Sequence, residues 1–141
     1  MAQGMGDRPY YGYVENLYEV VQSNLTKFRF DSATESVSLI KGLVDEPLTT
    51  DGPVAFAHID VDRYESVPTC LTRIVPNLIV GGSIIIDDYN DWSGCRNATD
   101  EYLQTVPGQF TRGESAGALK ITKKVRGGPV ETKRSLRPGH P

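Results

Sequence analysis

Two short apolar runs, each ending in aspartate, decide the fold. Residues 54–60 read VAFAHID, and residues 83–88 read SIIIDD. Unbroken apolar runs of this length are typical of strands in a parallel sheet that is covered on both faces. We therefore expect two neighbouring buried strands, with His58 inside the core of the first.

A helix is predicted between these strands. Apolar residues recur there at steps of four, three and four, which is helical spacing: Val67, Leu71, Ile74 and Leu78. Pro76 should end or kink this helix, and Gly81-Gly82 should form the turn into the second strand. A further helix is expected over residues 93–104. Strand, helix, strand, helix indicates an α/β domain with a parallel sheet.

The flanking segments carry weaker signals. Steps of three and four between Val14 and Phe28 predict an amphipathic helix. Residues 36–40 resemble a short strand that stops at Lys41-Gly42. Downstream, residues 109–112 and 118–125 are expected to form a hairpin.

Composition indicates a soluble globular protein, because 38% of the residues are hydrophobic and 23% are charged. The longest apolar runs fall well short of the roughly 20 residues of a membrane helix. Residues 1–7 lack the basic and apolar regions of a signal peptide, so we expect a cytoplasmic protein without a membrane partner. Cys70 and Cys95 stand alone, which argues against a disulfide framework or a zinc site.

Charge is distributed unevenly along the chain. Residues 1–119 hold 8 Lys or Arg against 17 Asp or Glu, whereas residues 120–141 hold 7 against 1. The acidic body argues against nucleic acid as a partner. We expect one partial domain over residues 1–125, followed by a disordered, basic, Gly/Pro-rich tail over residues 126–141.

The chemistry is expected where the two strands end. Asp60 and Asp62 follow the first strand, and Asp87 and Asp88 follow the second. In neighbouring parallel strands, these carboxylates would meet at one edge of the sheet, where ligands bind in open α/β sheets. Their mutual repulsion would be relieved by a cation, and oxygen ligands suit Mg²⁺. Taken singly, either pair could instead cap a helix or occupy a solvated turn.

These motifs, in this order, resemble the macrocin O-methyltransferase family. The likeness runs from about residue 13 to residue 125 and is densest over residues 54–102. It is carried by AHIDVDRYES at 57–66, IIDDY at 85–89 and Trp92. The resemblance implies a Rossmann-like class I methyltransferase sheet. It also implies an enzyme that uses S-adenosylmethionine (SAM) and Mg²⁺ to methylate a hydroxyl of a sugar or other vicinal diol.

The resemblance also implies roles for individual residues. Three of them would hold Mg²⁺: Asp60, Asp87 and Asp88. Asp62 would be the general base that accepts the hydroxyl proton. Lys41 and Gly42 would lie at the adenine pocket of SAM, although Lys41 could equally be a solvated strand end.

The sequence departs from the family at the N-terminal side. Class I methyltransferases open with a strand and a glycine-rich turn that cradles SAM, but Gly4 and Gly6 follow no predicted strand. The N-terminal strands and the SAM loop are therefore expected to be missing. A truncated gene, a degenerate remnant, and completion by another chain or in a homo-oligomer all stay open.

Two other functions stay open as well. Asp60-Val61-Asp62 after an apolar strand could belong to a DxD-type glycosyltransferase or to a phosphatase. The phosphatase pattern requires Thr or Val two residues after the second Asp, where this chain has Tyr64. The third reading is a non-catalytic remnant or binding module of the same fold.

Overall fold

The computed structural model separates the chain into two compact units, residues 1–47 and residues 48–141. It describes residues 15–28, 30, 37–44, 46, 48–61 and 63–124. The predicted tail over residues 126–141 and the general base Asp62 lie outside these ranges. The domain boundary at residue 125 stays a prediction. No helix in the described ranges is long and apolar enough to cross a membrane.

The described residues of the N-terminal unit form one helix, α1, at Leu17–Lys27. It confirms the helix predicted from the apolar spacing, and its last turn is closed by the amide of Phe28, which bonds to the carbonyls of Asn24 and Leu25. The strand predicted over 36–40 is wrong, because residues 37–40 have no strand structure. A strand needs a neighbour for its backbone hydrogen bonds, and no strand is found in the described part of this unit.

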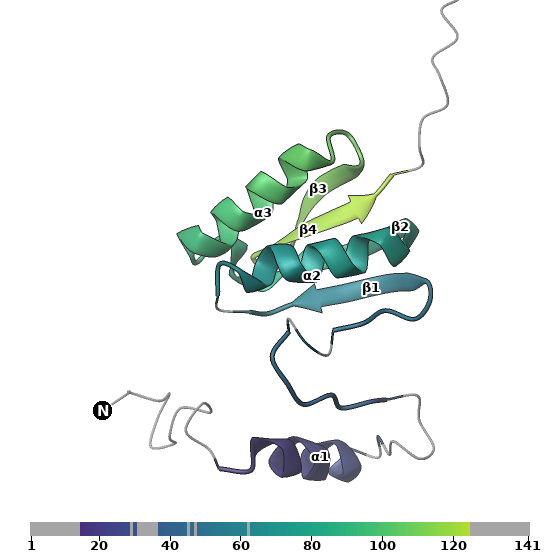
Figure 1. The fold of residues 1–141 in the computed structure, drawn as a ribbon, viewed down its shortest axis with the longest axis vertical. Coiled ribbons are helices and arrows are strands. Elements are labelled where there is room, and N and C mark those ends of the chain that lie inside the picture. Colours follow the sequence, from purple (N-terminus) through teal and green to yellow (C-terminus); the bar gives the residue numbers. More distant parts are fainter. Residues whose placement is uncertain are drawn as a thin grey trace, which may run out of the picture. The chain divides into compact units, whose positions relative to one another are not determined.

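The C-terminal unit is built on a four-stranded sheet (Figure 1). The strands are β1 (Val54–Ile59), β2 (Leu78–Ile86), β3 (Phe110–Ser115) and β4 (Ala118–Lys123), in the spatial order β1-β2-β4-β3. β1 and β2 are parallel, as predicted. β3 and β4 form the predicted hairpin, and β4 pairs antiparallel with β2.

Two helices cover this sheet: α2 at Ser66–Ile74 and α3 at Ser93–Thr105. α2 ends two residues before Pro76, and a 3-10 turn, η2, follows at Val75–Asn77. The helices and strands share one apolar core, in which the fully buried aliphatic side chains are Val67, Leu71, Ile84, Ile86 and Ile121. Fully burying one such side chain contributes about 1.5–3 kcal/mol, so this core holds the sheet and the helices together.

β2 begins earlier than predicted. Leu78 belongs to the strand and not to the helix, and Gly81-Gly82 lie inside β2 and not in a turn. Leu78 pairs with Val54 and Ser83 with Phe56, so extra residues of β2 bulge out opposite β1. The glycines permit this bulge, because Gly81 has a φ of 80° and a Cβ at Gly82 would lie 2.9 Å from the Ile79 carbonyl oxygen.

The expectation that both sheet faces are covered is wrong for the described part of the unit. α2 and α3 lie side by side on the same face (Figure 1). On β1, Ile59 is buried, whereas Phe56 is 62% exposed. Since successive strand residues point to opposite faces, Phe56 and His58 point away from the helices.

Candidate active site

The structure brings the ends of β1 and β2 together. Ile59 pairs with Ile86 in a parallel register, so Asp60 and Asp87 each follow the last residue of neighbouring strands. Asp87 and Asp88 begin a 3-10 turn, η3, at Asp87–Tyr89. The prediction that the two strand ends share one sheet edge is therefore confirmed. Asp60, Asp87 and Asp88 stand at this edge, which we call the acidic edge.

Asp87 is engaged by a neighbour that the sequence did not indicate. Its Oδ1 lies 3.1 Å from Nε2 of His58, and both side chains are about half exposed. The interpretation of His58 as a core histidine is thus wrong. β1 is an edge strand, and the sheet face onto which His58 points is not covered by α2 or α3. The imidazole therefore reaches the carboxylate at the strand end instead of the core.

The three aspartates differ in their surroundings. Asp60 and Asp87 are exposed, whereas Asp88 is partly buried. The Asp88 carbonyl accepts hydrogen bonds from the amides of Asp91 (3.2 Å) and Trp92 (2.9 Å).

The carboxylates also lie close to the first turn of α3. Burial raises the pKa of the Cys95 thiol, the interaction with Thr99 lowers it in part, and the negative charges of Asp88 and Asp87 each raise it by a smaller amount. The turn that carries Asp87 and Asp88 thus packs against α3.

The donor chemistry of this edge suits Mg²⁺, since it consists of carboxylate oxygens. The side-chain arrangement is less complete. Across the ranges that the structure describes, no three His, Cys, Asp or Glu side chains gather closely enough to hold a metal ion. Asp87 faces His58, and Asp62 lies outside these ranges. The backbone thus supplies the shared edge, whereas the described side chains do not form a three-ligand set there.

A polar network next to this edge could not be found from the sequence. The Tyr89 hydroxyl lies 3.1 and 3.2 Å from the two carboxylate oxygens of Asp100, and Arg112 forms an ion pair with the same carboxylate at 2.9 Å. Burial raises the pKa of Tyr89, and the hydrogen bond to Asp100 raises it further, while Arg112 partly opposes the shift. Tyr89 comes from η3, Asp100 from α3 and Arg112 from β3, and sequence spacing alone does not bring these three elements together.

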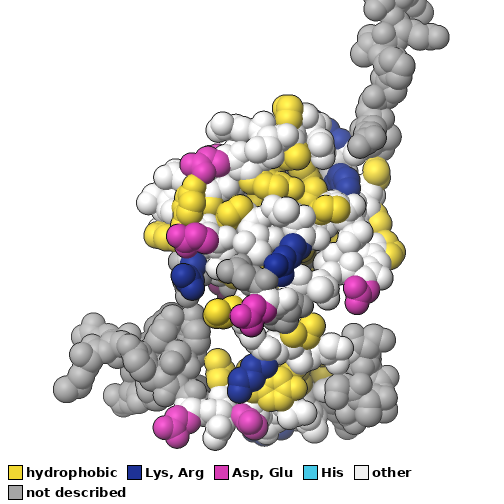
Figure 2. Space-filling model, in the orientation of Figure 1, with side chains coloured by type: hydrophobic (Ala, Val, Ile, Leu, Met, Phe, Trp, Pro, Cys, Tyr) yellow, Lys and Arg dark blue, Asp and Glu magenta, His cyan; other side chains and the backbone are white. Residues whose placement is uncertain are grey.

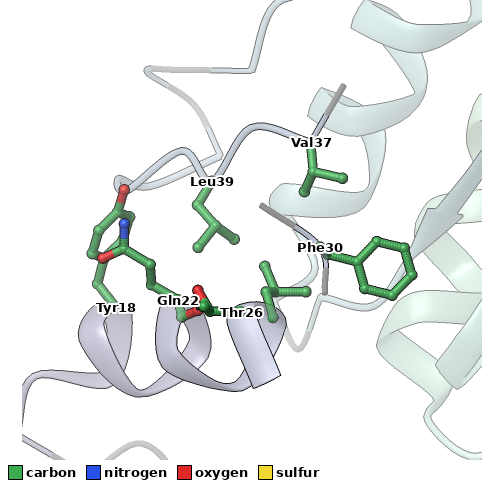
Figure 3. A pocket seen from close by; sticks show the side chains of 7 residues that line it. Tyr18, Gln22, Thr26, Phe30, Val37 and Leu39 are labelled. Carbon is green, nitrogen blue, oxygen red and sulfur yellow. Dashed lines mark hydrogen bonds between the residues drawn. The ribbon is translucent and has the colours of Figure 1, made fainter. Parts of the chain in front are cut away.

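Lys41 and Gly42 lie in the N-terminal unit. Both are exposed, and Gly42 has a φ of 153°, a region that favours glycine. Lys41 lines a cavity of about 460 Å³, together with Asn16, Leu17, Tyr18, Val21, Leu39 and Ile40. A smaller cavity of about 80 Å³ adjoins the same helix (Figure 3), where Tyr18, Gln22 and Thr26 of α1 face Leu39 and Val37.

Comparison with known proteins identifies the family. Residues 11–107 match the family described as macrocin-O-methyltransferase (TylF). The chain belongs to this family. The match includes Lys41, Gly42 and all four aspartates, and it confirms the resemblance seen in the sequence.

Two curated relatives are O-methyltransferases. Demethyldecarbamoylnovobiocin O-methyltransferase of Streptomyces niveus is 37% identical over 76 residues, which cover 52% of this chain and 29% of the relative. The 8-demethyl-8-(2,3-dimethoxy-alpha-L-rhamnosyl)-tetracenomycin-C 4'-O-methyltransferase of Streptomyces olivaceus is 33% identical over 86 residues, covering 60% of this chain and 32% of the relative. The matches thus span about a third of the length of these curated relatives.

A solved structure confirms the fold class. The structure of the O-methyltransferase NovP resembles this chain with a TM-score of 0.67 at 27% sequence identity, covering 76% of this chain and 45% of that chain. The predicted α/β, Rossmann-like methyltransferase sheet is therefore correct, and this chain carries a part of it.

Proposed function

We propose that this chain contributes the acidic half of a SAM-dependent O-methyltransferase that acts on a hydroxyl of a sugar or other vicinal diol. The observation that carries the proposal is the in-register ending of β1 and β2, which sets Asp60 beside Asp87-Asp88 within the segment that matches the family. In the Streptomyces olivaceus relative, the methylated molecule carries a rhamnosyl group. We therefore favour a deoxysugar hydroxyl as the acceptor.

Asp60, Asp87 and Asp88 would hold Mg²⁺ in this proposal, and Lys41 with Gly42 would contact SAM. When bound, the metal would favour ionisation of an acceptor hydroxyl. Asp62 would accept the hydroxyl proton as general base. The acceptor oxygen would then bond to the methyl carbon of SAM as the carbon–sulfur bond breaks, which releases S-adenosylhomocysteine.

The test is methyl transfer from SAM with a deuterated methyl group to a panel of rhamnosides and catechols, followed by mass spectrometry. We expect a labelled product with Mg²⁺ and none with EDTA. Asp60→Asn should remove the product. Asp51→Asn, an exposed carboxylate in the loop that enters β1, is the matched control and should keep it. Equal product formation with EDTA and with Mg²⁺ would contradict the metal-assisted reaction.

A second function is a non-catalytic binding module of the same fold. It is favoured by the lack of a three-ligand set among the residues described on the acidic edge. A chain that binds neither SAM nor Mg²⁺, yet melts cooperatively, would support this function over the first. The family match gives no support to the glycosyltransferase and phosphatase readings.

The remaining predictions concern partners and location. Figure 2 shows Asp and Glu side chains as well as Lys and Arg on the C-terminal unit. We propose that the ligand is a small molecule and not a nucleic acid, because residues 1–119 hold 17 acidic against 8 basic residues. A cytoplasmic location and a homo-oligomer or completing chain also stay proposals.

A further inference from the structure

The two aspartates after β2 stand on a very short element. η3 spans only Asp87–Tyr89, and the chain turns again at Asn90 before α3 begins at Ser93. A single 3-10 turn has few backbone hydrogen bonds of its own. The direction of its carboxylates must therefore be set by contacts from neighbouring elements.

His58 contacts the Asp87 carboxylate itself, and Arg96 contacts the main chain that follows the two aspartates. The Arg96 Nε donates to the Tyr89 carbonyl at 3.1 Å, and its terminal nitrogen NH2 donates to the Asn90 carbonyl at 3.0 Å. The centre of its guanidinium group also lies 5.5 Å from the centroid of the Tyr89 ring. A planar guanidinium can satisfy two adjacent carbonyls and lie over a ring, which a lysine ammonium cannot do.

Arg96 also connects the turn to a fixed part of the molecule. It belongs to α3, whose buried residues Cys95, Ala98 and Leu103 pack into the core. Two side-chain contacts from α3 and β3 act further from the backbone of the turn. Asp100 and Arg112 hold only the hydroxyl at the tip of the Tyr89 ring. Arg96 is the only one of the three that holds the main chain directly behind Asp87 and Asp88.

We propose that Arg96 is a positioning residue, which fixes the main chain of the turn that carries Asp87 and Asp88 at the shared sheet edge. This inference rests on the proposed function for the role of the aspartates. The positioning itself does not require that function, because it depends only on the contacts of Arg96 with the turn. Arg96 makes no contact with the reacting atoms in this proposal.

The chain carries a built-in reporter for this turn. Trp92 is the only tryptophan in the sequence and is 37% exposed. Its backbone amide donates a hydrogen bond to the Asp88 carbonyl in the turn. Acrylamide quenching of its fluorescence therefore measures how firmly the turn is held. We would compare the wild-type chain with Arg96→Gln, Arg96→Lys and Asn97→Ala, an exposed neighbour on the same helix that serves as the control.

We expect stronger quenching in both Arg96 variants and wild-type quenching in Asn97→Ala. We also expect Mg²⁺ affinity, measured by calorimetry, to fall about 10–100-fold in both Arg96 variants, as for other residues that orient metal ligands. The melting temperature should change little, because Arg96 is exposed. A purely structural role would lower the melting temperature without this selective loss of affinity.

Wild-type quenching in Arg96→Gln would overturn the proposal. Wild-type quenching and Mg²⁺ affinity in Arg96→Lys would also overturn it, since the planar guanidinium group would then be unnecessary. If the wild-type chain itself bound no Mg²⁺, the metal part of the proposed function would fail. The quenching comparison would still decide whether Arg96 holds the turn.

Discussion

The two units of the chain differ in how firmly they fix their candidate site residues. In the C-terminal unit, Leu71 and Ile84 are completely buried between the sheet and its helices. In the N-terminal unit, α1 has no buried residue, and Lys41 follows a segment without regular structure. This comparison shows that a packed core fixes the strand ends that form the acidic edge. The proposed SAM contacts have no such core behind them among the described residues of their own unit.

The largest effect that tests this difference is expected at Asp87. Asp87→Asn should abolish methyl transfer and Mg²⁺ binding, because the amide retains the shape of the side chain but loses its charge. The fold should persist, since Asp87 is exposed. Asp91→Asn, an exposed aspartate four residues further on, is the control. Isotope transfer and calorimetry measure both properties, and normal turnover in Asp87→Asn would show that the acidic edge is not the metal site.

A smaller loss is expected at Asp62. Asp62→Asn should slow methyl transfer by about 10²–10⁴-fold, the usual contribution of a general base, while Mg²⁺ still binds. Single-turnover rates with saturating Mg²⁺ measure this effect. Loss of Mg²⁺ binding in this variant would instead make Asp62 a ligand.

The packing contrast can be tested with one substitution placed in each unit. Leu71→Ala should lower the free energy of unfolding by about 2–5 kcal/mol, because Leu71 is 0% exposed and its removal leaves a cavity. Leu17→Ala in α1 should cost about 0.5 kcal/mol or less, as is usual at surface positions, since Leu17 is 40% exposed. Urea unfolding followed by Trp92 fluorescence measures both. Equal losses would show that α1 shares the core of the C-terminal unit.

The smallest expected effect is on alkaline stability. Burial raises the pKa of Cys95 above its ordinary 9.0 and the pKa of Tyr102 above its ordinary 10.0. The folded chain therefore retains protons that the unfolded chain loses, so the free energy of unfolding should fall as pH rises above about 9. It should be insensitive to these groups below that pH. Thermal melts between pH 7 and pH 10.5 measure the decline, and Cys95→Ala should reduce it. A melting temperature that rises over this range would contradict the assignment.

The sequence predicted the parts of the fold that depend on local patterns. The alternation of apolar runs and helical spacing indicated β1, α2, β2, α3 and the hairpin, and the aspartates at the strand ends indicated the acidic edge. It failed where long-range partners decide the structure. Residues 37–40 have strand-like side chains but no neighbouring strand in the described part of their unit. His58 is exposed because its side of the sheet is not covered by α2 or α3, and a pattern of apolar neighbours cannot show this.

The contacts around the Asp87–Tyr89 turn were missed for the same reason. Arg96, Asp100 and Arg112 come from α3 and β3, and their spacing along the chain carries no signal that they meet. In retrospect, Arg96 and Asp100 stand four residues apart on one helix, so they lie on the same helix face. That spacing predicts a shared neighbour but not its identity.

The most direct test of the central claim, that this chain binds SAM and Mg²⁺ together, is a set of thermal melts with neither ligand, with each alone and with both. A ligand that binds only the folded state adds about 2.7 kcal/mol of stability at a hundred times its dissociation constant. We predict that Mg²⁺ and SAM each raise the melting temperature and that Asp87→Asn loses the Mg²⁺ shift alone. An unchanged melting temperature under all four conditions would contradict the claim.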